Sequence, residues 1–230
     1  MLLNNANITT FKAKLLSKNV QTATIIIYDD WLGKALSPLY LGKQETFKEL
    51  KLKFLIEDIN DESCLINIGN IIRQFEKCTI KFDDLIFYYD CTIASKDHER
   101  LQKGYFALNV DLKGVAYTSI VNEVLDHISS KTITVLGNRQ TSAILTVTAP
   151  VDTISVTVTG LGTDSIIIKN LKANIPVVVD GEVYTVISNG LNKFADTDMW
   201  AFPVLQPGTN TIGVSSPNNV INVSYKPKYF

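Results

Sequence analysis

Apolar and polar residues alternate with a period of two along much of this 230-residue chain, and this alternation constrains the fold more than any other feature. In residues 49–56 every even position holds a large apolar side chain, while charged residues stand at 49, 51 and 53. Residues 106–113 repeat the pattern. Successive side chains of a β-strand point to opposite faces, so both segments are predicted to be half-buried strands. The predicted inward-facing residues are Leu50, Leu52, Phe54, Ile56, Phe106, Leu108, Val110 and Leu112.

One segment has the period of a helix instead. Between residues 62 and 76, apolar side chains recur at spacings of three and four, and Asp61 and Ser63 are suited to cap its start. The polar face is not basic, so a helix packed on a sheet is favoured over one that binds a membrane. The predicted apolar stripe is Leu65, Ile68, Ile72 and Phe75.

The composition changes after about residue 130, where charge becomes sparse and Val, Ile and Thr dominate. Short β-branched runs follow one another, separated by turn residues, as in an all-β sandwich. Asp180-Gly181 is predicted to be the two-residue loop of a hairpin, and Pro207-Gly208 a type II turn. The last two strands, near 212 and 223, are predicted to pair as a closing hairpin. We therefore predict a mainly β protein with two domains: residues 1–132, a β-sandwich or sheet with one packed helix, and residues 133–230, a β-sandwich.

Charge and hydropathy exclude several functional classes. A net charge of −1 gives no basic excess for nucleic acid or an anionic membrane, and no apolar run is long enough to span a bilayer. The first residues lack a positively charged leader, so we expect synthesis and folding in a cytoplasm. Cys64, Cys78 and Cys91 are an odd number without C-x-x-C spacing, which predicts buried, unreactive thiols.

The sequence contains no recognisable catalytic or metal-binding motif. The nucleophile elbow, the P-loop, the H-E-x-x-H helix and the EF-hand loop are all absent, and the glycines at 160–162 lead into a strand rather than the helix that a dinucleotide site needs. Neither His98 nor His127 sits near another ligand at helix or strand spacing, and a catalytic base would also need an adjacent nucleophile. The acidic pairs, such as Asp29-Asp30 and Asp83-Asp84, fall at predicted turns, where Asp is common. We expect no catalytic residue, cofactor or metal.

Residues 196–210, DTDMWAFPVLQPGTN, can be interpreted either as a binding site or as part of a hydrophobic core. Trp200 could stack on a sugar, and Asp196 and Asp198 could help to hold a metal. Alternatively, Trp200 and Phe202 point the same way in a strand and fill one core layer, and this interpretation is favoured because the neighbouring alternate positions lack a set of sugar-binding side chains. The predicted structural signature is Trp200, Phe202, Pro203, Pro207, Gly208 and Asn210.

These residues also carry a family resemblance. The segments NKFADTDMWAFPVLQPGTNTIGVSS and VINVSYKPKYF resemble the C-terminal part of siphophage distal tail (Dit) proteins, in which an acidic residue precedes W-x-F-P-x-L-x-P-G-x-N-x-I. The order of strand, helix and strands before residue 132 is similar to that of the family's ring-forming domain. The chain departs from the pattern at Ala201, where an acidic residue is common, and at Lys228, where arginine is common.

The resemblance implies a structural protein of the virion tail tip and not an enzyme. It implies a ring-forming first domain, a galectin-like second domain, and a homo-hexameric ring that joins the tail tube protein to the tail-associated hub or lysin protein. Receptor-binding proteins are further candidate partners, whereas nucleic acid and membrane are not expected.

Two other functions remain open at this stage. The second domain could be a carbohydrate-binding module that recognises host cell-wall glycan, although the His, Asn, Arg, Trp and Glu set of true galectins is missing. The chain could also hydrolyse glycan, which would require two carboxylates about 5–9.5 Å apart across a cleft. A glycan-binding assay with Trp200 and Tyr184 variants distinguishes a carbohydrate-binding module from a purely structural protein. Hydrolysis of cell-wall glycan that is lost in a folded carboxylate variant would establish the hydrolase.

Overall fold

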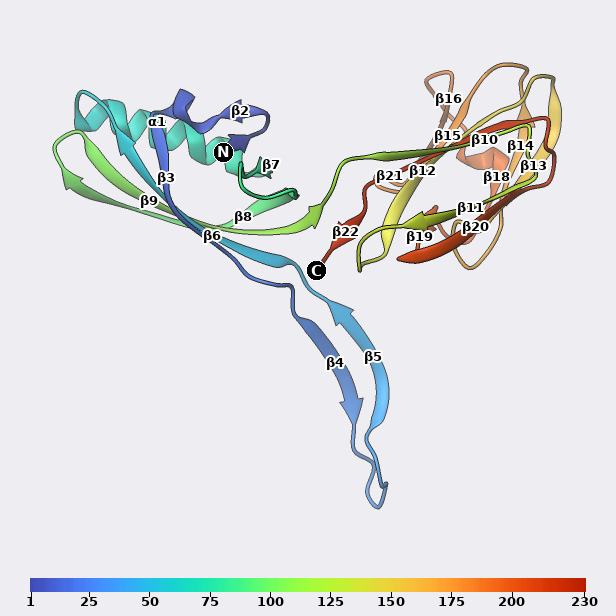
Figure 1. The fold of residues 1–230 in the computed structure, drawn as a ribbon, viewed down its shortest axis with the longest axis horizontal. Coiled ribbons are helices and arrows are strands. Elements are labelled where there is room, and N and C mark those ends of the chain that lie inside the picture. The colour runs from blue at the N-terminus through green and yellow to red at the C-terminus, as the bar shows by residue number, and fades with distance from the viewer. The chain divides into compact units, whose positions relative to one another are not determined.

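The computed structural model describes all residues from 1 to 230, and most of its regular structure is β-strand (Figure 1). The chain forms two compact units, Met1–Tyr117 together with Phe230, and Thr118–Tyr229. The division thus falls earlier than the predicted 132/133. Strand β10 (Val121–Asp126) already belongs to the second unit, where it pairs with β21 (Val220–Tyr225). The sequence boundary was placed where charged residues become sparse, and β10 contains Glu123 and Asp126, so it was assigned to the first domain.

The first unit is built on one antiparallel sheet with the strand order β2-β1-β7-β8-β9-β6-β3. A 3-10 helix, η1 (Ile8–Phe11), connects β2 to β3. The strands are β1 (Leu2–Leu3), β2 (Ala6–Asn7), β3 (Ala13–Val20), β6 (Lys48–Glu57), β7 (Lys77–Lys81), β8 (Tyr88–Gln102) and β9 (Tyr105–Tyr117).

The two strands predicted from period two lie side by side in this sheet. β6 and β9 pair in antiparallel register, with Phe54 opposite Leu108 and Leu52 opposite Val110. All eight residues predicted to face inward are buried, so the prediction from alternation is confirmed.

Helix α1 (Asp61–Phe75) covers the apolar face of this sheet, and the ring of Phe75 lies 5.7 Å from that of Phe54. The helix was correctly predicted, but its buried stripe and its cap differ from the prediction. Leu65 is 45% exposed, and Asn60 rather than Asp61 or Ser63 caps the helix by accepting a hydrogen bond from Ser63 N at 2.8 Å. Two apolar stripes overlap in this segment, and packing on the sheet selects the one that contains Cys64, Ile68, Ile71 and Phe75.

Strands β4 (Ile25–Asp30) and β5 (Leu39–Glu45) form a two-stranded sheet of their own, which we call the arm (Figure 1). At its base, Thr46 N donates to Thr24 O at 2.9 Å and Thr24 N donates to Thr46 Oγ1 at 2.8 Å. These two bonds close the arm where it joins the larger sheet.

The second unit is a sandwich of two antiparallel sheets, in the orders β10-β21-β12-β15-β16-β17 and β11-β20-β13-β14-β18. β19 adds to β12, and a 3-10 helix, η2 (Phe194–Asp196), precedes β18. The remaining strands of these sheets are β11 (Ser130–Val135), β12 (Thr141–Thr148), β13 (Thr153–Thr159), β14 (Ile166–Leu171), β15 (Val177–Asp180), β16 (Thr185–Ser188), β17 (Leu191–Asn192), β18 (Thr197–Asp198), β19 (Val204–Leu205) and β20 (Gly208–Val214). The short strand β22 (Lys228–Tyr229) belongs to neither of the two sheets.

The predicted sandwich core is present, since side chains from both sheets form one buried cluster. Two hairpin predictions were wrong in detail. β20 and β21 lie in opposite sheets rather than paired, because β20 pairs with β11 and β13 while β21 pairs with β10 and β12. The β15–β16 hairpin exists, but Asp180 pairs with Thr185, so its loop is residues 181–184 instead of two residues. The Asp180 carboxylate accepts the backbone N–H groups of Glu182 and Val183, which stabilises this longer loop.

Candidate functional site

Trp200 is 91% exposed, so the prediction that it fills the sandwich core was wrong. The prediction assumed strand alternation through residues 196–204, but β18 ends at Asp198 and β19 begins at Val204. Between these strands the chain turns, and Met199 and Phe202 pack against the core while Trp200 points to solvent.

Phe202 and Pro203 occupy the structural positions predicted for them. The Phe202 ring packs against the core cluster and contacts the rings of Tyr184, at 5.3 Å, and Phe194, at 6.1 Å. Pro203 is buried, and its carbonyl accepts a hydrogen bond from Ala143 N at 2.9 Å. These contacts fix the loop to β12.

The turn at Pro207-Gly208 has the backbone conformation that a type II turn requires, because Gly208 has a φ of +92°. Asn210 stabilises it through its side chain, which donates to the carbonyls of Gln206 at 2.7 Å and Gly208 at 3.0 Å. In return, Asn210 Oδ1 accepts from Gln206 N at 3.2 Å. Both residues are therefore structural.

The acidic residues of the same segment pair with neighbouring side chains. Asp196 accepts hydrogen bonds from Lys193 Nζ at 2.7 Å and from Asn170 Nδ2 at 2.9 Å, and these bonds lower the pKa of its carboxyl. Asp198 lies 4.0 Å from Lys169 Nζ. No group of three or more His, Cys, Asp or Glu side chains is placed to hold a metal ion.

The two histidines and the other acidic pairs are also apart from one another. His98 lies against the Phe106 ring, and His127 lies 3.5 Å from Asp126; both are exposed. Asp83 pairs with the N-terminal amine and Asp84 with Lys18. None of these contacts joins a nucleophile to a base.

All three cysteines are buried and free, as predicted. Cys78 and Cys91 face each other across β7 and β8. Burial raises the pKa of the Cys78 thiol to about 12 and also raises the pKa values of Cys91 and Cys64. A protonated thiol is a poor nucleophile, so these residues are packing groups.

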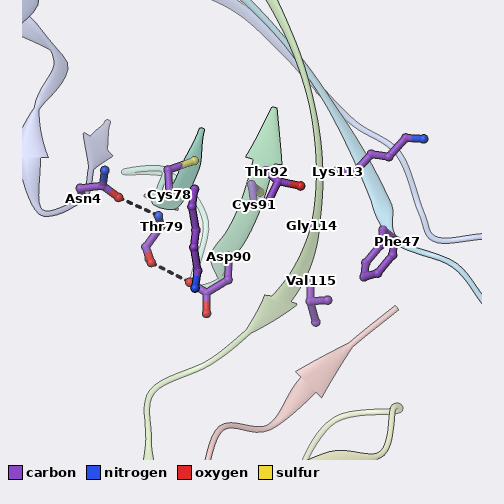
Figure 2. A pocket seen from close by; sticks show the side chains of 11 residues that line it. Asn4, Phe47, Cys78, Thr79, Asp90, Cys91, Thr92, Lys113, Gly114 and Val115 are labelled. Carbon is purple, nitrogen blue, oxygen red and sulfur yellow. Dashed lines mark hydrogen bonds between the residues drawn. The ribbon is translucent and has the colours of Figure 1, made fainter. Parts of the chain in front are cut away.

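A cavity of about 590 Å³ lies in the first unit beside β7, β8 and β9 (Figure 2). Its polar groups bond to one another: the backbone Thr79 N donates to Asn4 Oδ1 at 2.9 Å, and Thr79 Oγ1 donates to Asp90 Oδ1 at 2.6 Å. Tyr117 also donates to Asp90, at 3.1 Å. Phe47 and Val115 line the same cavity. The cavity therefore has apolar walls and an already satisfied polar network.

The arm exposes a continuous run of apolar side chains, which the sequence reasoning did not identify. Its four consecutive apolar residues, Ile25 to Tyr28, are 41–51% exposed, and the loop beyond them exposes Trp31 at 63% and Leu36 at 102%. The available signal was the run TIIIY, in which apolar residues follow one another without alternation. A strand that is apolar on both faces normally has both faces covered.

Comparison with known proteins connects this architecture to phage tails. Residues 136–229 match the family model described as siphovirus-type tail component, C-terminal domain. Among curated protein sequences, none matches the chain.

Solved structures match over nearly the whole chain. The crystal structure of the Dit protein of phage SPP1, described as a paradigm of the hub adsorption apparatus in phages that infect Gram-positive bacteria, is 9% identical. It matches with a TM-score of 0.77 over 100% of this chain and 98% of its own. A chain of the phage P2 baseplate in its activated conformation with Ca matches at 11% identity and a TM-score of 0.54, over 98% of this chain and 93% of its own. The same baseplate with Sr gives 10% identity and a TM-score of 0.55, over 95% and 92%.

No transmembrane helix accompanies this fold, since neither the length nor the hydropathy of any helix suffices to cross a bilayer. Residues 136–229 are thus similar to the C-terminal domain of siphovirus-type tail components, and the fold of the whole chain is similar to that of the SPP1 Dit protein.

Proposed function

We propose that this chain is the distal tail protein of a long-tailed phage and forms a hexameric ring that connects the tail tube to the tail-associated hub protein. Its role is that of a rigid adaptor with one face for the tube and another for the hub. The family of the second unit and the fold of the whole chain support this function. So does the polar chemistry of the chain, in which the acidic groups of the cavity and of residues 196–198 bond to other side chains.

The exposed arm is the main observation that supports a ring. Burying apolar surface yields about 25 cal/mol per Å², and contiguous exposed patches of this kind mark protein–protein contacts. In β4 the side chains of both faces are exposed, so one flat partner surface would cover only half of them. A closed ring supplies neighbours on two sides.

The edges of the large sheet support head-to-tail contacts. β3 is an edge strand, and β8 beyond Thr92 pairs only with β9, because β7 pairs with residues 88–92. The sheet thus has two different unpaired edges. Contacts between unlike surfaces of identical subunits close into rings, and unpaired edges are natural sites for them.

Excision of the arm tests this function. Because Thr24 and Thr46 are hydrogen-bonded to each other, residues 25–45 can be replaced by Asn-Gly without separating the ends of β3 and β6. Light scattering of the purified full-length chain mixed with tail tube protein should give a six-copy assembly, and the excised variant should remain a folded monomer. Ile154→Asp, at a site 87% exposed in the second unit, is the matched control and should assemble normally. An excised variant that assembles as well as the full-length chain would refute the role of the arm.

A further inference from the structure

Three aromatic side chains are exposed within residues 184–200 of the second unit. Tyr184 is 69% exposed, Phe194 50% and Trp200 91%. They come from the loop before β16, from η2 and from the loop after β18. The Trp200 indole has neither a ring contact nor a hydrogen bond to another residue. Exposed large rings that lie within a short stretch of chain are typical of a binding surface.

The half-buried ring of Phe202 holds two of these rings in place. It meets Tyr184 edge to face and lies nearly parallel to Phe194, with an interplanar angle of 25°. Phe202 itself packs against the core, and so does Met199 on the other side of Trp200. The rings of Tyr184 and Phe194 are therefore positioned before a ligand arrives, which reduces the entropy lost on binding. We call Tyr184, Phe194, Trp200 and Phe202 the aromatic edge.

A polar cluster lies in the same part of the chain. Lys193 Nζ bridges the Asp196 carboxylate, at 2.7 Å, and the carbonyl of Asn170, at 3.1 Å, while Asn170 Nδ2 donates to Asp196 at 2.9 Å. A carboxylate can accept about four hydrogen bonds, so Asp196, with a side chain 38% exposed, keeps capacity for a ligand. Asp198, two residues before Trp200, is 64% exposed.

We propose that the aromatic edge and this polar cluster form a saccharide-binding surface. The C–H face of a pyranose ring is apolar and stacks on an aromatic ring, whereas its hydroxyl groups bond to carboxylate, amide and ammonium groups. Both kinds of group are present here, and neighbours hold Tyr184, Phe194 and Asp196 in place. The centre of a protein–protein interface is depleted of charged residues, but here Lys193, Asp196 and Asp198 alternate with the aromatic residues along the sequence from 184 to 200, which favours a saccharide.

This inference does not depend on ring formation, because every residue of the surface belongs to the second unit. The test uses the full-length chain on an array of oligosaccharides built from neutral hexoses, deoxyhexoses and N-acetylhexosamines. We expect a subset to bind, and Trp200→Ala and Tyr184→Ala each to weaken binding by about tenfold or more, as truncation of a central aromatic anchor does. Ile154→Ala, an equally exposed residue outside the surface, should leave binding unchanged.

Tryptophan fluorescence reports on the stacking directly. The chain has two tryptophans, so Trp31→Phe leaves Trp200 as the sole indole. Addition of a bound oligosaccharide should then shift and quench its emission. The proposal is overturned if no saccharide of the array binds, if Trp200→Ala binds like the parent chain, or if Trp200→Ala instead abolishes binding of the hub protein.

Discussion

Asp61 accepts the backbone N–H of Gly104 at 2.8 Å, which ties the first turn of α1 to the turn between β8 and β9. Arg100 Nε donates to the other oxygen of the same carboxylate at 2.8 Å. The turn returns a second contact, because Gly104 O accepts from Asp58 N at 3.0 Å. The helix is therefore fastened to the sheet at its start as well as through its buried stripe.

This junction predicts a pH-dependent stability difference. The bond from Gly104 lowers the pKa of Asp61 below its ordinary value of 3.8, so its contribution is fully present above that value and is lost as pH falls through the lowered one. We expect Asp61→Asn to lower the melting temperature at pH 7 and the gap to the parent chain to narrow at pH 3. Glu62→Gln removes a charge from the same turn without this bond. An equal gap at both pH values for Asp61→Asn would contradict the assignment.

Gly114 and Gly69 should respond to alanine in opposite directions. A Cβ at Gly114 would lie 2.4 Å from Cys91 Sγ and 2.5 Å from Asp90 O, a backbone atom, so we expect a loss of about 1–3 kcal/mol. Gly69 is exposed in α1 and has no atom within 4 Å of the Cβ position. Its replacement should stabilise by about 1 kcal/mol. Urea unfolding measures both, and stabilisation by Gly114→Ala would show that the β8–β9 contact is looser than described.

Alanine substitutions of Trp200 and of Phe202 should have different effects on the free energy of unfolding, although the two residues are only two positions apart. Replacement of the exposed Trp200 by alanine should change the free energy of unfolding by less than about 0.5 kcal/mol. Phe202→Ala removes contacts with Tyr184, Phe194 and the core and should lose about 2 kcal/mol, less than a fully buried phenylalanine. Thermal unfolding compares the two. Equal losses would restore the interpretation of Trp200 as a core residue.

The three thiols should be unreactive in the native protein. Since burial raises the pKa of Cys78 to about 12 and that of Cys91 as well, both remain protonated at pH 8. A thiol-reactive disulfide reagent should therefore modify the chain only slowly until guanidinium unfolds it, after which three thiols react. Rapid modification of the native chain would contradict this burial.

How far the sequence predicts this structure depends on how local the governing interaction is. Alternation correctly predicted which side chains from Leu50 to Ile56 are buried, because a strand with one buried face has apolar residues at every second position of its own sequence. The stripe of α1 and the exposure of Trp200 depended on partners distant in sequence, so the local period gave the wrong side chains. The arm was missed for a related reason. An apolar run such as Ile25–Tyr28 has the same local pattern whether the strand is buried within its own chain or exposed on the surface.

The location of the arm in an assembled particle tests the central claim most directly. Cryo-electron microscopy of the chain bound to tail tube protein should show a ring of six copies in which β4 and β5 of each copy pack against a neighbouring copy. A particle in which the arms extend into solvent without touching another copy, or a bound chain that stays monomeric, would contradict the account.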